Sequence, residues 1–193
     1  MELTPQAEVR LRRIFKAFNR FMLLLWRLGL ARYGNPSRYG GAIMVIKHHG
    51  HKTGLTRYAP VNYAAAGDQV YCTAGFGPAT HWYRNLMANP EVELWLPDGR
   101  WHGIAEDASD DPQRVTWLRK VLVASGFAGP LFGFNPRRMT DGQIEGMLDT
   151  YRLVRIRKTA PTTGPGGPGD LAWVWPLSTL LLLGLVLRRR KQT

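Results

Sequence analysis

The sequence is poor in cysteine, in acidic residues and in long apolar runs. Cys72 is the single cysteine among 193 residues, which excludes an internal disulfide framework and favours a reducing compartment. Aspartate and glutamate together number 14, against 26 lysines and arginines, and the formal net charge is +12. A charge excess of this size indicates an anionic partner.

The positive charge is concentrated at the two ends of the chain. Residues 1–32 and the stretch 188–191 carry most of it. Nucleic-acid-binding domains usually carry a basic stripe on the folded domain itself, so this distribution argues against a nucleic-acid partner. We expect membrane lipid, whose cytoplasmic surface is anionic, to be the partner instead.

The one long apolar run lies at the C-terminus. Residues 159–170, TAPTTGPGGPGD, predict a Pro/Gly-rich linker without packed structure. The uncharged run 171–187 follows it and ends in RRRK. A helix over this run rises about 26 Å, at the short end of the range for a bilayer span. With Trp173 and Trp175 at one boundary, residues 171–193 predict a C-terminal transmembrane helix with a basic tail.

Residues 1–32 predict a basic amphipathic helix. The stretch 9–30 mixes arginines and lysines with large apolar residues, a composition typical of helices that lie on a membrane surface. Packing on the folded domain is equally compatible with it. A signal peptide is disfavoured because the run FMLLLW is short and the region before it is too long. We therefore expect a protein at the cell membrane with its folded domain on the cytoplasmic side.

Residues 33–158 predict a single domain of short strands. Alternating or apolar stretches bounded by turn residues predict strands at 41–49, 55–66, 69–75, 91–96, 100–108 and 151–158. Helices are expected at 81–89, 115–125 and 141–149. Strands joined by hairpins, with one helical excursion, predict a mainly β (α+β) fold, a small antiparallel barrel with flanking helices.

The first candidate site is the segment GHKTGLTR, residues 50–57. A turn flanked by glycines exposes several backbone N–H groups, and Lys52, Thr53 and Arg57 add charge and a hydroxyl. The segment lacks the glycine spacing and following helix of a Walker loop. An anion-binding turn and an ordinary hairpin with solvated charges both fit this stretch alone.

A second Gly-rich segment, AGFGPATHWYRN, follows at residues 74–85. Gly75 and Gly77 would permit a close approach of the backbone to a ligand. In the helix after them, His81 and Asn85 share a face, and Trp82 is placed either to stack on a flat ring or to pack in the core. The cluster of His48, His49 and His51 lacks metal-site spacing, so no metal is expected.

Together, GHKTGLTRYAPV and VYCTAGFGPATHWYRNLMANPEVEL resemble the deazaflavin-dependent nitroreductase family, also described as quinone reductases that use reduced coenzyme F-420. The resemblance runs from about residue 41 to residue 106 and more diffusely to residue 158. It implies a split β-barrel, often a homodimer, that binds coenzyme F-420. It also implies hydride transfer from the reduced cofactor to a small-molecule acceptor, either quinone-like or a nitro or enone compound.

The resemblance implies the site residues as well, but it assigns no catalytic residue. Cations of the 50–57 segment would bind the cofactor's phosphate and carboxylate-rich tail, and the second segment would close the pocket. The implied cofactor-binding residues are Lys52, Thr53, Gly54, Arg57, Ala59, Pro60, Ala74, Gly75, Phe76, Gly77, Trp82 and Asn85.

The sequence departs from the family pattern at three places. His51 replaces the arginine usual in the turn, which removes a fixed charge and a bidentate donor. Phe76 stands where many members carry a lysine. Phe127, Phe132 and Phe134 would make the acceptor wall apolar.

Two other functions fit the same barrel. One is an FMN-dependent reductase of the same superfamily, and the other is a non-catalytic barrel that carries a lipid or a tetrapyrrole. Membrane attachment fits a lipid-soluble acceptor such as a membrane quinone, so the oxidoreductase remains the leading hypothesis.

Overall fold

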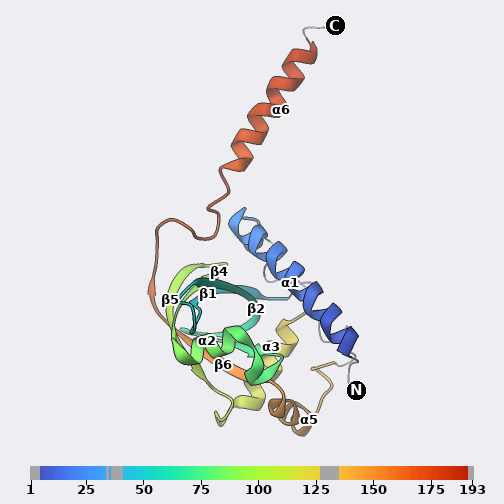
Figure 1. Ribbon diagram of the computed structural model, residues 1–193, viewed down its shortest axis with the longest axis vertical. Coiled ribbons are helices and arrows are strands. Elements are labelled where there is room, and N and C mark those ends of the chain that lie inside the picture. The colour runs from blue at the N-terminus through green and yellow to red at the C-terminus, as the bar shows by residue number, and fades with distance from the viewer. Residues whose placement is uncertain (1–4, 34, 36–40, 127–134, 191–193) are drawn as a thin grey trace.

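The computed structural model describes residues 5–33, 35, 41–126 and 135–190, and its centre is a β-barrel (Figure 1). Neighbouring strands are antiparallel and follow the order β1-β2-β3-β6-β5-β4. The barrel is closed because β1 pairs with β2 on one side and with β4 on the other. The strands are β1 (Ile43–His49), β2 (Thr56–Ala66), β3 (Gln69–Ala74), β4 (Glu91–Leu96), β5 (Gly99–Asp107) and β6 (Arg152–Pro161). The mainly β barrel with flanking helices that the sequence predicted is thus a closed barrel of antiparallel strands.

Alternation along the strands separates an inner core from two outer ones. Met44 and Ile46 of β1 point into the barrel, whereas Val45 between them contacts Trp26 and Trp95 outside it. A third cluster fills the space between the other side of the barrel and its flanking helices. The interior contains Met44, Ile46, Ala59, Tyr63, Val70, Cys72, Ala74, Tyr83, Leu86, Val92, Leu94, Leu96, Ala105, Val154 and Ile156.

Short helices cover the barrel. The helix α2 (His81–Ala88) sends Tyr83 and Leu86 into the inner core. On another side lie α3 (Arg114–Ala124), α5 (Asp141–Gly146) and a 3-10 turn, η3 (Met147–Asp149). Thr140 and Gln143 form a capping box at the start of α5, which explains why this short helix begins there. Two further 3-10 turns are η1 (Ala31–Tyr33) and η2 (Gly77–Ala79).

The helix α1 (Pro5–Arg27) runs diagonally along the outside of the barrel (Figure 1). Its C-terminal half is the attached part. Trp26 is only 2% exposed and lies against Val45 and Trp95, with Leu23 and Leu25 packed beside it. Burial of a side chain this large contributes about 2–3 kcal/mol.

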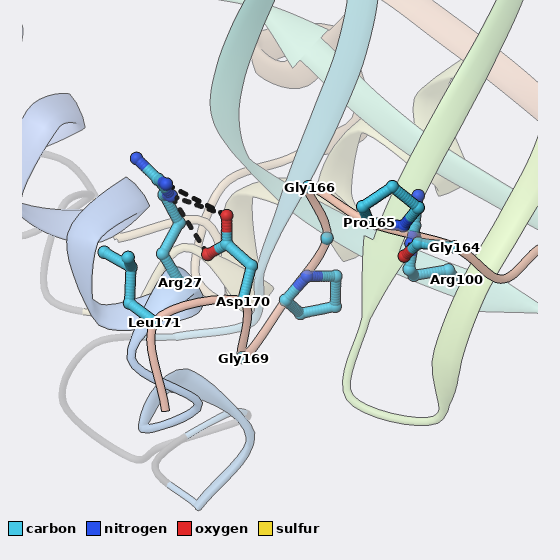
Figure 2. A pocket seen from close by; sticks show the side chains of 10 residues that line it. Arg27, Arg100, Gly164, Pro165, Gly166, Gly169, Asp170 and Leu171 are labelled. Atoms are coloured by element: carbon cyan, nitrogen blue, oxygen red, sulfur yellow. Dashed lines mark hydrogen bonds and ion pairs between the residues drawn. The ribbon is translucent and has the colours of Figure 1, made fainter. Parts of the chain in front are cut away.

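The Pro/Gly-rich segment, expected to be an unstructured linker, is docked on the body of the protein. Residues 159–161 continue β6. Beyond them, Arg100 donates a hydrogen bond from Nη1 to the carbonyl of Gly164 (2.6 Å), and Asp170 binds the guanidinium of Arg27 at 2.9–3.1 Å (Figure 2). We refer to residues 162–171 as the strap. A hollow of about 490 Å³ lies beneath it.

The prediction of a C-terminal transmembrane helix is wrong. No helix of the described ranges is long and apolar enough to cross a membrane. The helix α6 (Val174–Arg190) begins later than the apolar run, because residues 171–173 form turns and the Leu171 N–H binds the carbonyl of Arg27. Its uncharged part, residues 174–187, rises about 21 Å against a hydrocarbon core of about 30 Å. It projects from the body as a lone helix (Figure 1).

Candidate functional site

A groove of about 830 Å³ lies where the ends of β1 and β2 meet the start of α2. One wall is the 50–57 turn, and a second is the loop from Phe76 to Asn85, so the two segments singled out in the sequence face the same space. A third wall is the side of α1 from Lys16 to Leu23, which no sequence pattern had placed there.

The 50–57 turn is a closed loop of backbone hydrogen bonds. The Gly50 N–H binds the carbonyl of Leu55 (2.9 Å), and the N–H groups of Thr53 and Gly54 both bind the carbonyl of Gly50. Gly54 has a φ of +65°, in the left-handed region where a side chain would be strained. The backbone therefore fixes the shape of the turn, and the exposed side chains of Lys52 and Arg57 take no part in it.

Asn85 of α2 clamps the turn to the barrel. Its Oδ1 accepts the backbone N–H of His51 (3.0 Å) and lies 2.6 Å from His51 Nδ1. Its Nδ2 lies 3.4 Å from Nδ1 of His48. Asn85 is only 7% exposed. These contacts show that Asn85 positions the turn. Asn85 also lines the groove, and the direct cofactor contact that the resemblance implied stays a prediction.

His48 is the buried member of this network and lines the groove from the barrel side. Burial is the main cause that lowers its pKa to about 4, with smaller contributions from His49 and Arg57. The imidazole is therefore neutral at pH 7. Its Nδ1 is an acceptor for the Asn85 amide, so the three side chains His48, Asn85 and His51 form one connected network.

The glycines of the second loop approach the protein's own chain. Gly77 has a φ of +59°, and a Cβ there would lie 2.2 Å from the carbonyl oxygen of Thr150. A Cβ at Gly75 would meet the ring of Tyr151 at 3.5 Å. Packing against Thr150 and the positive φ explain Gly77, whereas the contact at Gly75 is an ordinary one that a small side chain would tolerate. The close approach of both glycines to a ligand stays a prediction.

The structure brings together more than half of the residues that the resemblance implied. Trp82 packs on the inner core, as one of the two alternatives had it, and also lines the groove, while stacking on a flat ring stays a prediction. Ala74 and Gly77 are buried behind the loop. The implied residues in the lining are Lys52, Thr53, Arg57, Ala59, Phe76, Trp82 and Asn85, whereas Gly54, Pro60, Ala74, Gly75 and Gly77 lie outside it. The proposed phenylalanine wall, Phe127, Phe132 and Phe134, lies outside the described residues.

Sequence reasoning missed Lys16, Asn19, Arg20 and Leu23 of α1, and also Tyr58 of β2. Their spacing of three and four residues in α1 was visible as one helix face, but nothing in the sequence showed what that face lies against. A partial signal existed for Tyr58, because it lies near the start of β2, which follows the 50–57 turn directly.

The charge of the groove is uncompensated. Of the residues that the structure describes, its lining holds Lys16, Arg20, Lys52 and Arg57 and no aspartate or glutamate. In the part of the chain that the structure describes, none of these cations forms an ion pair with a carboxylate. Beside them lie the buried Ala59 and the rings of Tyr58, Phe76 and Trp82. Cations and aromatic rings in one groove fit a flat aromatic ligand with an anionic tail.

A closed antiparallel barrel with such a groove belongs to the class of barrels that bind an aromatic, anionic cofactor. The family described as F420H(2)-dependent quinone reductase matches residues 30–129, which include β1 to β5, α2 and α3. The chain belongs to this family. It is an oxidoreductase, and its cofactor is coenzyme F-420.

Two kinds of relative accompany this match. The Mycobacterium tuberculosis protein named "Putative F420H(2)-dependent quinone reductase Rv3178" is 28% identical over 99 residues, which are 50% of this chain and 83% of that protein. A solved F420-H2 dependent reductase (FDR-A) is 19% identical with a TM-score of 0.44, covering 60% of this chain and 93% of that one. A structure titled "domain-swapped dimer" is 18% identical with a TM-score of 0.45, covering 80% and 100%.

Proposed function

We propose that this protein transfers a hydride from reduced coenzyme F-420 to a quinone-like acceptor, and that the groove is the site of transfer. The observation that carries the proposal is the set of uncompensated cations beside aromatic side chains in one open groove. A phosphate and carboxylate tail meets the cations, and a flat ring system meets the apolar end. The reduced deazaflavin, when bound, supplies the hydride.

The contribution of the protein is positioning and polarity. Lys52 and Arg57 stand on a turn whose backbone is closed by its own hydrogen bonds and clamped by Asn85, so their Cα positions are fixed before any ligand arrives. Preorganised cations lose little freedom on binding. Ala59 and Trp82 exclude water from the end of the groove nearest the barrel core.

The test measures the Kd of coenzyme F-420 for the full-length chain by fluorescence titration. We expect Lys52→Ala with Arg57→Ala to raise the Kd about 10- to 100-fold, since each removes a charge-assisted contact. Arg137→Ala with Arg138→Ala is the matched control, because both arginines are exposed and lie outside the groove. Equal affinity of wild type and the Lys52/Arg57 variant would overturn the assignment of the groove. A spectrum of bound FMN would support the alternative cofactor.

We also propose that the protein works at a membrane surface, where a quinone would be dissolved. Supporting this, Ile14, Phe18 and Phe21 of α1 are 64%, 40% and 55% exposed and share one helix face, with further exposed leucines along α6. Basic residues flank these apolar faces, as in helices that lie in the headgroup region. Flotation with vesicles of anionic lipid should retain the wild type, and Phe18→Ser with Phe21→Ser should release it. If light scattering instead showed a dimer mass for the wild type and a monomer mass for this variant, the apolar face would be assigned to the homodimer that the resemblance implied.

A further inference from the structure

The side of α1 that faces the groove is polar. Lys16, Asn19, Arg20 and Leu23 follow the spacing of a single helix face, and all of them line the same groove as the 50–57 turn. The exposed stripe of Ile14, Phe18 and Phe21 lies on the other side of the helix.

This orientation is the reverse of what burial alone would select. A helix that packs on a domain turns its apolar face inward and its charges to solvent. The N-terminal half of α1 instead directs Lys16 and Arg20 toward the groove and leaves three large apolar side chains exposed. Hydrophobic packing of this half does not explain the arrangement, which places two cations where the groove already has Lys52 and Arg57.

The position of α1 over the groove is fixed by its other half. Trp26 is buried against the barrel, and the strap binds the end of the helix: Gly169 N–H to the Trp26 carbonyl (2.9 Å) and Asp170 to the Arg27 guanidinium (Figure 2). Trp175 Nε1 also donates to the carbonyl of Leu28 (3.0 Å). Since Arg20 lies less than two turns before Trp26, these contacts limit how far its side chain can leave the groove.

Neither cation has a carboxylate partner among the residues that the structure describes. Among the residues described, Arg27, Lys47, Arg100, Arg114, Arg119, Arg155 and Lys158 each lie beside a carboxylate. Lys16 and Arg20 make no such pair, and no acidic side chain lines the groove. Like charges that gather without a counter-charge repel one another, so an anionic ligand is what such an arrangement stabilises.

We propose that Lys16 and Arg20 bind the anionic tail of the cofactor, and that α1 forms the third wall of the cofactor site. The inference rests on the proposed function of the groove. A quinone acceptor is uncharged and the deazaflavin ring is flat and largely apolar, so the phosphate and the glutamate carboxylates are the groups that these two cations would contact. Affinity for the tail would therefore depend on a helix that lies entirely before the matched family region.

The experiment compares two ligands that differ only in the tail. Coenzyme F-420 and the deazaflavin riboside, which lacks the phosphate and the glutamates, are titrated against full-length wild type and the variant Lys16→Glu with Arg20→Glu. We expect the Kd for F-420 to rise about 10- to 100-fold in the variant. The Kd for the riboside should change by less than about twofold, which also shows that the variant is folded with its groove intact.

A matched charge control separates contact from long-range attraction. Arg137→Glu with Arg138→Glu changes the net charge by the same amount at exposed positions outside the groove. It should leave F-420 binding unchanged. An equal loss in this control, or unchanged F-420 binding in the Lys16/Arg20 variant, would overturn the role of α1 while leaving the proposed function in place. If wild type bound the riboside and F-420 equally, the tail would have no site here. If it bound neither, the proposed function itself would fail.

Discussion

Two neighbouring residues of β1, Lys47 and His48, lie beside two different clusters of cations. One cluster is paired with a carboxylate, and the other, in the groove, is not. Lys47 points to the outside of the barrel, where Glu93 binds it at 3.0 Å and binds Arg100 at 2.7 Å. Glu93 also accepts the indole N–H of Trp95. Although burial opposes this, the hydrogen bonds from Lys47, Trp95 and Arg100 lower the pKa of Glu93. The outer cluster is therefore satisfied without any ligand.

His48 points the other way, toward the groove. The cations that line the groove have no carboxylate beside them among the described lining residues. The same strand thus separates a cluster that serves the fold from one that is left open. The difference indicates that charge in the outer cluster contributes to stability, whereas charge in the groove contributes to binding. The following predictions test that separation.

The largest effect on stability is expected at Glu93. Replacing it, Glu93→Ala, leaves Lys47 and Arg100 without a counter-charge in a site where Glu93 is only 8% exposed. We expect the free energy of unfolding to fall by about 3 kcal/mol, measured by chemical denaturation. Lys52→Ala is the comparison in the groove and should change stability by less than about 0.5 kcal/mol, because its exposed side chain has no partner to leave behind. Similar losses in the two variants would erase the distinction between the clusters.

The pH dependence of stability should reveal His48. Its pKa is lowered to about 4 in the folded protein, so below its ordinary value near 6.5 the unfolded chain binds the proton more readily. Stability is therefore unaffected above pH 6.5 and is lost as the pH falls toward 4. Between pH 6.5 and 5 the loss from this group is about 1.5 kcal/mol. Between pH 6.5 and 5, the free energy of unfolding of His48→Asn should therefore fall by about 1.5 kcal/mol less than that of the wild type. Parallel curves for the two proteins would show that His48 is not buried in its neutral form.

The barrel was the part of the structure closest to the sequence. β4 occupies the predicted residues 91–96, and α2 ends one residue before its predicted end. Local alternation and turn residues determine these elements, and β1 to β3 and β4 to β5 pair through hairpins nearby in the chain, whereas β6 pairs with the distant β3 and β5. The pairing of β1 with β4, which closes the barrel, joins strands distant in the chain, and no local pattern predicts it.

The terminal segments were harder for a physical reason. Arg27 and Asp170 are 143 residues apart, and nothing local to either residue shows that they meet. The composition of residues 162–170 correctly excluded a helix or strand there, but lack of regular structure does not imply lack of contacts. The C-terminal helix was expected to begin at residue 171, but it begins at Val174 because residues 171–173 form turns next to the strap. This error has the same cause.

In the candidate site, two of the three walls were predicted from the sequence. Asn85 was expected to contact the cofactor, which stays a prediction; the structure adds that its amide also binds His51 and His48. An asparagine has the same appearance in a sequence whether its amide meets a ligand or a turn. The third wall was invisible because the face that α1 presents to the groove depends on where Trp26 is buried.

The smallest effect is expected at the strap. Asp170→Asn removes the charge that binds Arg27, but the Arg27 side chain is 42% exposed, so the loss of stability should stay below about 1 kcal/mol. The more sensitive measurement is hydrogen exchange of the amides from Lys16 to Arg27, which should become faster as the end of α1 loosens. Asp141→Asn, which breaks an ion pair with Arg119 on the exposed side of α5, is the matched control and should leave these amides unchanged.

A loosened α1 should also raise the Kd for coenzyme F-420 about two- to fivefold. Faster exchange without any loss of affinity would mean that the strap stabilises the helix but that the helix is not a wall of the cofactor site.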